Sequence, residues 1–207
     1  MKKRYRLVKI AGLVLLSGMA VCFWAAKNEA KADPLQPQIA EKILRFHVLG
    51  NSDSKEDQEV KLKVRDAIGA YMSDYLKDAG GIEQTREIVE VHMDEIIEVA
   101  EQVLEEEGFD YGADAMLTDT EFPEKTYGDY TFPAGTYEAL EVVLGDGAGH
   151  NWWCVLYPNM CFRGSVYEVV EEEAGKALRE VLTPEEYADV FDSGKYRVRL
   201  KFLEYFR

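Results

Sequence analysis

The stretch that runs from Tyr137 to Tyr157, YEALEVVLGDGAGHNWWCVLY, has the strongest influence on the fold. Residues 137–144 predict one strand, and the apolar run at 152–157 predicts a second. Residues 145–149 between them carry a glycine at every second position. Because glycine adopts the positive φ angles of tight turns without steric cost, this segment predicts a turn between two strands.

Segments on both sides of this pair predict further strands and several helices. Hydroxyl residues open two of the helices, since Ser54 stands before the first and Thr183 before the last. Strand patterns occur at 43–49, 109–117 and 196–202, and apolar residues at helical spacing occur at 55–79, 83–107, 166–182 and 184–193. We therefore expect a single α+β domain, in which a mixed or antiparallel sheet packs with about four helices.

The first 32 residues differ in charge from the remainder of the chain. They hold seven basic residues and one acid, whereas residues 33–207 hold 17 basic and 38 acidic residues, so the net charges are +6 and −21. A basic start, 17 uncharged residues at 10–26 and the sequence Ala30-Lys31-Ala32 are typical of an export signal. We expect residues 1–32 to be a signal peptide or an uncleaved anchor, residues 33–42 a lead-in, and residues 43–207 the exported α+β domain.

The acidic body restricts the partners that the protein can bind. A net charge of −21 is repelled by the phosphates of nucleic acids and by anionic lipid headgroups. We therefore expect no nucleic-acid partner, and we expect contact with a membrane only through the N-terminal segment.

Export also changes the interpretation of the cysteines. An oxidising compartment permits a disulfide between Cys154 and Cys161, and the alternative is two buried free thiols. A different hypothesis joins Cys154 to His150, which are the residue types of a cysteine hydrolase acting at the cell envelope. On a strand, however, four residues separate two side chains by about 13 Å, which is too far for proton transfer.

The sequence predicts no cofactor and no metal site. The glycines at 145–149 lack the G-x-G-x-x-G spacing of a dinucleotide loop and precede a strand rather than a helix. The segment NSDSKED at 51–57 superficially resembles a calcium loop, but it lacks the central glycine and the distal acid. It matches a helix cap at every position. The histidines and cysteines have no recognisable zinc spacing.

Trp152 and Trp153 are adjacent, so they point to opposite faces of a strand. If one ring enters the core, the other faces outward and, beside Tyr157 and Phe162, has the composition of a binding hot spot. The alternative is a sheet covered on both faces by helices, which would bury both rings.

Three blocks of the chain carry a family resemblance. They are RFHVLGNSDSKEDQEVKLKVRD at 45–66, FPAGTYEALEVVLGDGAGHNWWCVLYPNMCF at 132–162, and the closing segment 196–206. The string GHNWWCV-x-x-P-x-x-C-F is the most specific part. Together the blocks resemble the stage II sporulation protein R family of endospore-forming bacteria. His47 and Gly50 stand where the family's R-V-I-A-N-S-D-S form predicts Arg and Ala.

The resemblance implies a signalling role. Members of this family are exported from the forespore into the space between the two septal membranes. There they trigger a membrane-embedded aspartic protease of the mother cell, which cleaves the precursor of a sigma factor. The resemblance implies no catalytic residue and no cofactor. As the surface that meets the protease we expect Gly147, Gly149, His150, Asn151, Trp152 and Trp153, with Asn51 and Asp53 in a second candidate segment.

Overall fold

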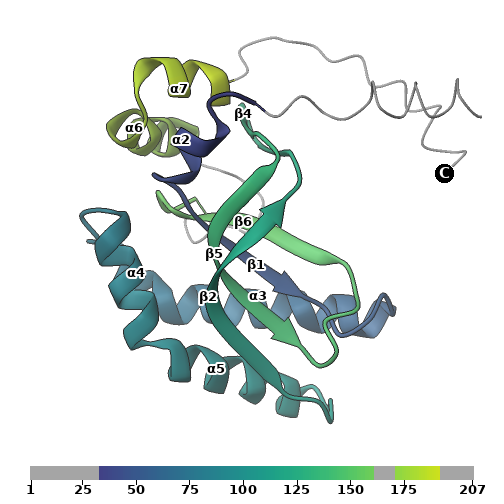
Figure 1. Ribbon diagram of the computed structural model, residues 1–207. Helices are drawn as coiled ribbons and strands as arrows, with labels where there is room; N and C mark the ends of the chain where they lie inside the picture. Colours follow the sequence, from purple (N-terminus) through teal and green to yellow (C-terminus); the bar gives the residue numbers. More distant parts are fainter. Residues whose placement is uncertain (1–32, 161–170, 192–207) are drawn as a thin grey trace, which may run out of the picture. The chain divides into compact units, whose positions relative to one another are not determined.

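A computed structural model describes residues 33–160 and 171–191 of the 207-residue chain. Its centre is a four-stranded sheet in the order β2-β5-β1-β6 (Figure 1). β1 (Leu44–Leu49) runs parallel to β5 (Gly135–Leu144) and antiparallel to β6 (Asn151–Tyr157), and β2 (Ala113–Phe122) runs antiparallel to β5. The sheet is therefore mixed, and the predicted α+β class is confirmed.

The glycine-rich segment connects β5 to β6, as predicted, but these two strands are not neighbours. β1 lies between them and pairs with both, so that Val48 stands opposite Val142 on β5 and opposite Trp152 on β6. Residues 44–48 of β1 are all buried, as expected for a strand in the middle of a sheet. The chain thus places its first strand between two strands that come about one hundred residues later.

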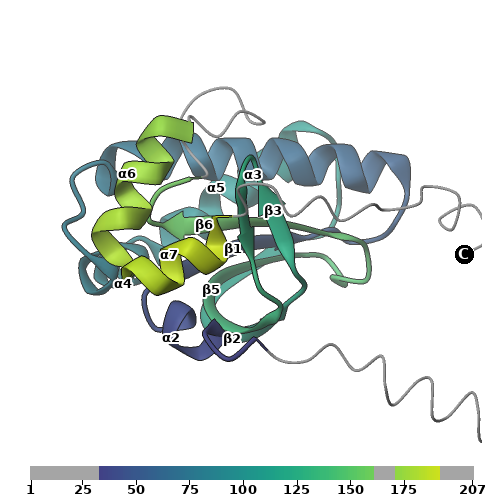
Figure 2. The ribbon, with the colours of Figure 1, turned by 90° about the horizontal axis from the view of Figure 1, so that it is seen from above.

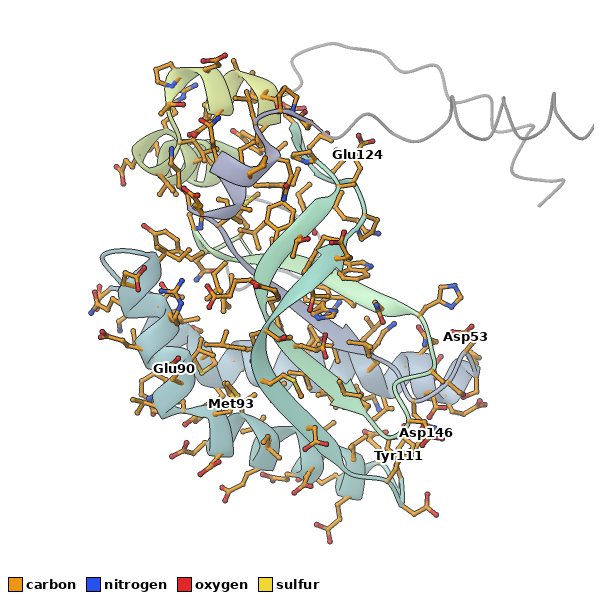
Figure 3. All side chains as sticks on the ribbon, viewed as in Figure 1. Asp53, Glu90, Met93, Tyr111, Glu124 and Asp146 are labelled. Atoms are coloured by element: carbon orange, nitrogen blue, oxygen red, sulfur yellow. The ribbon has the colours of Figure 1, made fainter. Side chains whose placement is uncertain are left out.

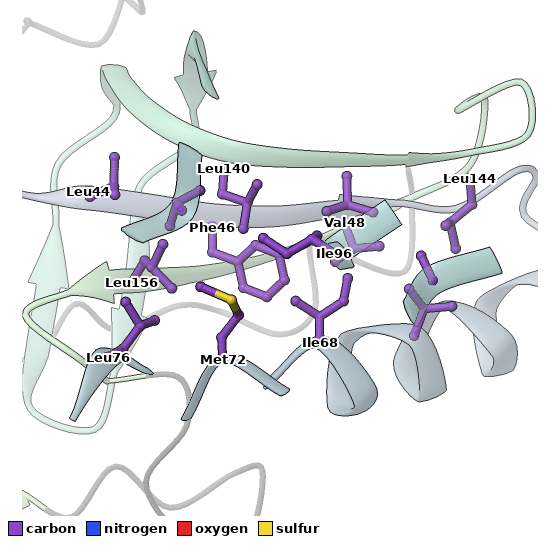
Figure 4. Close-up of a cluster of buried hydrophobic side chains, with 14 of the residues drawn as sticks. Leu44, Phe46, Val48, Ile68, Met72, Leu76, Ile96, Leu140, Leu144 and Leu156 are labelled. Atoms are coloured by element: carbon purple, nitrogen blue, oxygen red, sulfur yellow. The ribbon is translucent and has the colours of Figure 1, made fainter. Parts of the chain in front are cut away.

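Three helices cover one face of the sheet: α3 (Lys55–Leu76), α4 (Ile82–Val91) and α5 (Met93–Glu106). α3 begins as the sequence predicts, because the Ser54 hydroxyl accepts a hydrogen bond from Asp57 N at 3.0 Å. The helices and the sheet share a buried apolar cluster (Figure 4), which includes Phe46, Val48, Ile68, Met72, Ile96, Leu140, Leu144 and Leu156.

The prediction of a single helix over 83–107 is wrong, because α4 and α5 meet at His92 with a φ of −100° and a ψ of 16°. The His92 ring packs against Tyr75, with ring centroids 4.0 Å apart, and its Nδ1 is hydrogen-bonded to Tyr71 OH at 2.9 Å. Val89 and Ile96 are both buried on either side of the junction and are seven residues apart. The apolar spacing therefore continues across the break and does not reveal it.

The opposite face of the sheet carries a second apolar cluster near one end. The elements that supply it are α2 (Gln36–Ala40), the hairpin of β3 (Lys125–Tyr127) and β4 (Tyr130–Phe132), α6 (Glu171–Val181) and α7 (Pro184–Val190). Figures 1 and 2 show the three helices gathered at that end. α7 starts after Thr183, as predicted, and Thr183 forms a capping box with Glu186. The described part of the chain has six helices, where about four were predicted, because α2 was missed and one helix is divided.

Two predicted segments, the export signal at 1–32 and the closing strand at 196–202, lie outside the described residues. Among the helices of residues 33–160 and 171–191, none is long and apolar enough to cross a membrane.

Candidate partner-binding surface

The structure brings together parts of the two segments predicted as separate contact candidates, and it leaves Asn151, Trp152 and Trp153 outside, in β6. We call the combined surface the loop pair. It consists of residues 50–54, which follow β1, and residues 145–150, which connect β5 to β6. Because β1 and β5 are parallel neighbours, both segments leave the sheet at the same end. Figure 3 shows Asp53 and Asp146, one from each segment, at that end together with Tyr111.

Hydrogen bonds join the two segments of the loop pair directly. Ala148 N donates to Asn51 O at 3.1 Å, and Gly149 N donates to Gly50 O at 2.8 Å. The Asn51 side chain adds a third link, since its Oδ1 accepts a hydrogen bond from Asp146 N at 2.9 Å. Asn51 therefore links the two segments through both its main chain and its side chain.

The glycines of the loop pair have two different structural roles. Gly145 and Gly147 have φ angles of +55° and +60°, which confirms the predicted turn. Gly149 has no such angle, but a Cβ at this position would lie 2.5 Å from the carbonyl carbon of Ser52 and closer still to its oxygen. The first two glycines are needed for backbone conformation, and Gly149 is needed for the close approach of the two segments.

A buried carboxylate holds the loop pair against the start of α3. Asp57 is 6% exposed, and its Oδ2 accepts hydrogen bonds from Asn51 Nδ2 at 3.1 Å and from Ser52 Oγ. Its Oδ1 accepts a hydrogen bond from Tyr111 OH at 2.6 Å. The hydrogen bond from Ser52, followed by that from Tyr111, holds the pKa of Asp57 below its usual value. The sequence identified Asp57 as part of a helix cap and as the last residue of the second candidate segment, but it did not predict that this carboxylate joins the two segments.

His150 and Asp53 are the polar pair that the loop pair presents to solvent. Their side chains are 81% and 58% exposed, respectively. Asp53 Oδ1 lies 2.5 Å from His150 Nδ1 and also accepts a hydrogen bond from His150 N at 2.7 Å. The side-chain contact and then the main-chain hydrogen bond lower the pKa of Asp53. Lys61 Nζ donates to His150 O at 2.7 Å, which fixes the main chain beneath the pair.

The two tryptophans lie on opposite faces of β6, as predicted, and both are half-buried. Trp152 packs on the helix-covered face, edge to face with Phe46 at 5.5 Å between centroids. Trp153 packs on the other face, stacked on His47 with centroids 4.9 Å apart and planes 5° apart. Each ring packs against the domain, and neither is fully exposed. Of the two alternatives, the one in which both rings are covered is therefore closer to the structure than the one in which a tryptophan faces outward. Asn151, at the start of β6, is also half-buried.

The structure does not bring the proposed hydrolase residues together. Cys154 is 5% exposed and disulfide-bonded, and it lies in the middle of β6 opposite Phe46. His150 lies before the first residue of β6, and its Nδ1 contacts Asp53. Cys161 lies outside the described residues, so its pairing with Cys154 stays a prediction. No group of three side chains suited to hold a metal ion comes together within residues 33–160 and 171–191.

Sequence reasoning missed the two buried polar residues of β1, Arg45 and His47. Arg45 donates from Nε to Cys154 O at 2.9 Å, and its guanidinium lies 4.3 Å from the centroid of the Phe122 ring. His47 Nε2 lies 2.9 Å from Glu141 Oε2. Burial lowers the pKa of both groups. Polar residues that alternate with apolar ones predict a solvent-exposed face, but here the aromatic residues of the second cluster cover that face.

Comparison with known proteins agrees with the sequence blocks. The family model for stage II sporulation protein R (spore_II_R) matches residues 40–167, which include the whole loop pair. Stage II sporulation protein R of Bacillus subtilis (strain 168) is 34% identical over 189 residues, which cover 91% of this chain and 84% of the relative. No solved structure matches the chain. The chain belongs to the stage II sporulation protein R family.

Proposed function

We propose that this sporulation protein is an exported signal that activates a membrane-embedded aspartic protease of the mother cell, which then cleaves a sigma-factor precursor. The loop pair is the observation that supports a role as a ligand. Its two segments are joined by main-chain hydrogen bonds and by a buried carboxylate, and they present the exposed pair His150 and Asp53. A surface that is ordered before binding loses little conformational entropy when a partner docks on it, so it is suited to recognition.

Activation of a protease by such a ligand requires a difference in affinity. A ligand shifts a receptor between two states only as far as it binds one state more tightly than the other. A shift from 1:99 to 99:1 needs a difference of about ten-thousand-fold in affinity. On this proposal the loop pair contacts a part of the protease that differs between its inactive and active states.

The proposed place of action is the space between the two septal membranes, after export from the forespore. Residues 1–32 would direct export and would be either cleaved or retained as an anchor. The net charge of −21 over residues 33–207 disfavours binding to nucleic acids and to anionic lipid. The membrane-embedded protease is therefore the proposed partner, and the membrane itself is contacted only through the N-terminal segment.

The rival hypothesis of a Cys154–His150 hydrolase has less support from the geometry. A cysteine nucleophile needs a thiolate within hydrogen-bond reach of its base. The sulfur of Cys154 is buried and engaged in a disulfide, and His150 is paired with Asp53 outside the strand.

Reconstitution of signalling tests the proposed function. Cells that produce the protease and the sigma-factor precursor of the same species would also express this protein, with or without residues 1–32. Cleavage of the precursor would be followed by gel mobility. We expect cleavage only when the protein is present and exported. Absence of cleavage, with the protein shown to be folded and exported, would refute the proposal.

A pair of matched variants then tests the loop pair. The double substitution His150→Ala and Asp53→Ala removes an exposed hydrogen-bonded pair from the loop pair and should strongly reduce cleavage. The control Lys77→Ala and Asp74→Ala removes another exposed pair, with Nζ and Oδ1 3.4 Å apart at the far end of α3, and should leave cleavage unchanged. Equal cleavage by the two double variants would exclude His150 and Asp53 from the contact.

A further inference from the structure

β2 forms an open edge of the sheet. It is the outermost strand and pairs on one side only, with β5, over all ten residues from Ala113 to Phe122 without a register shift. Within residues 33–160 and 171–191, no other strand pairs with its second side. In a strand, alternate residues direct their N–H and C=O groups to each side, so about half of the residues of β2 present unpaired main-chain groups outward.

This edge lacks most of the features that protect an edge strand. Proteins usually prevent edge pairing with lysines, prolines, bulges or very short strands, and β2 has none of these. Met116, in the middle of the strand, is 45% exposed. What β2 has instead is negative charge, since Asp114, Asp119 and Glu121 are all exposed.

The charge along this edge selects between two kinds of added strand. From Asp110 to Glu124 the chain carries five acidic residues and no basic one. Pairing of β2 with β2 of a second copy would place three carboxylates from each strand along one ladder, and like charges across strands are destabilising. A strand with lysine or arginine side chains would meet the same carboxylates with favourable cross-strand pairs.

The open edge is continuous with the loop pair. Gly145 N donates to Gly112 O at 3.0 Å, one residue before β2 begins. Tyr111 OH donates to Asp57 Oδ1, the carboxylate that also holds Asn51. Figure 3 shows Tyr111 beside Asp146 and Asp53 at this end of the sheet. A partner that contacts the loop pair therefore reaches the first residues of β2 without crossing another element of the domain.

We infer that β2 accepts an extended, basic segment of the partner as a fifth strand of the sheet, starting beside the loop pair. Strand addition of this kind takes its affinity from main-chain hydrogen bonds and its specificity from alternate side chains. The inference rests on the proposed function and deepens it, because it names the chemistry of the protease segment that the signal binds: an extracytoplasmic stretch with basic residues on both of its faces.

Amide hydrogen exchange of the full-length protein, alone and with the detergent-solubilised protease of the same species, tests this inference. We expect amides of residues 113–122 to become protected on binding. The variant Asp114→Lys and Asp119→Lys should bind the protease about tenfold or more weakly, because two favourable cross-strand pairs become repulsive. The control Glu98→Lys and Glu105→Lys changes the net charge equally on exposed positions of α5 and should bind like the wild type.

The outcomes separate this inference from the proposed function. Binding that protects the loop pair and leaves residues 113–122 unchanged would overturn strand addition and leave the signalling role intact. Equal weakening by both charge-reversal variants would also overturn it, since only the net charge would then matter. Protection of β2 in the absence of protease would also overturn it. Protection that grows with protein concentration would assign the edge to a second copy, and protection independent of concentration would assign it to the predicted closing strand at 196–202, which carries basic residues at alternate positions. Absence of any binding to the protease would refute both proposals.

Discussion

Replacement of Gly149 by alanine is the sharpest test of how the loop pair is built. The Cβ added at this position would lie 2.5 Å from the carbonyl carbon of Ser52, whereas an ordinary contact is at least 3.4 Å. A difference of at least 0.9 Å must be taken up by main chain, because the two nearest obstructing atoms, the carbonyl carbon and oxygen of Ser52, are main-chain atoms. The two segments would therefore have to separate by about 1 Å, which would stretch the main-chain hydrogen bonds that join them.

The energetic cost follows from this separation. Overpacking of this kind costs about 1–3 kcal/mol. The hydrogen bond from Gly149 N to Gly50 O, 2.8 Å long, would also lengthen, and a hydrogen bond contributes about 1 kcal/mol. We expect a loss of about 3 kcal/mol in the free energy of unfolding. For a chain of this size that lowers Tm by about 6–12 °C.

Calorimetry of Gly149→Ala beside Gly81→Ala measures this effect. Gly81 precedes α4, and a Cβ there would meet no atom within 4 Å. We expect Gly81→Ala to change Tm by only about 1–3 °C, since no overlap is created. A Tm for Gly149→Ala equal to that of Gly81→Ala would refute the reasoning, because it would mean that the two segments do not approach each other as described. Gly149→Ala should also reduce precursor cleavage, since it displaces His150.

Three further predictions concern the buried polar groups. Asp57→Asn should lower the free energy of unfolding by about 2 kcal/mol at pH 7, because a hydrogen-bonded carboxylate is lost. The pKa of Asp57 is lowered in the folded state, so the wild type loses this stabilisation as the pH falls below about 4. The difference between the two proteins in urea unfolding should therefore close at that pH. Arg45→Ala should destabilise the protein by about 2 kcal/mol more than Arg45→Met, because methionine fills buried space that alanine leaves as a cavity. Equal urea midpoints would contradict this. Burial lowers the pKa of His47, so the unfolded chain takes up a proton at this residue first, and the wild type loses stability as the pH falls below about 6.5. His47→Gln should remove this part of the pH dependence of the free energy of unfolding. An unchanged pH dependence between neutral pH and pH 5 would show that His47 is not responsible.

The features that could be predicted from the sequence are those set by residues close together in the chain. Ser54 and Thr183 begin helices as predicted, because a hydroxyl beside a free main-chain N–H acts within three residues. Gly145 and Gly147 form the predicted turn, because the need for a positive φ is a property of a single residue. The strand character of residues 152–157 and the opposite directions of Trp152 and Trp153 follow from the period of two in any strand.

The sequence also named five residues of the candidate surface, but it placed them in two separate segments. The two segments come together in the loop pair only because β1 pairs with β5. The residues of these two strands are about one hundred positions apart in the sequence. The Tyr111 hydrogen bond to Asp57 depends on β2 reaching the same end of the sheet. Neither contact has a local signal, so spacing and composition could not predict them.

The tertiary structure alone decided the order of the strands, the break at His92 and the burial of Arg45. β1 could have paired at the edge of the sheet, and its alternating polar residues would then have faced water. Its position between β5 and β6 places Arg45 and His47 under the aromatic residues of the second cluster. The physical reason is that the hydrophobic effect is not directional. The sequence determines which faces of the helices and strands are apolar, but only the packing of the whole chain determines which of these faces pack against each other.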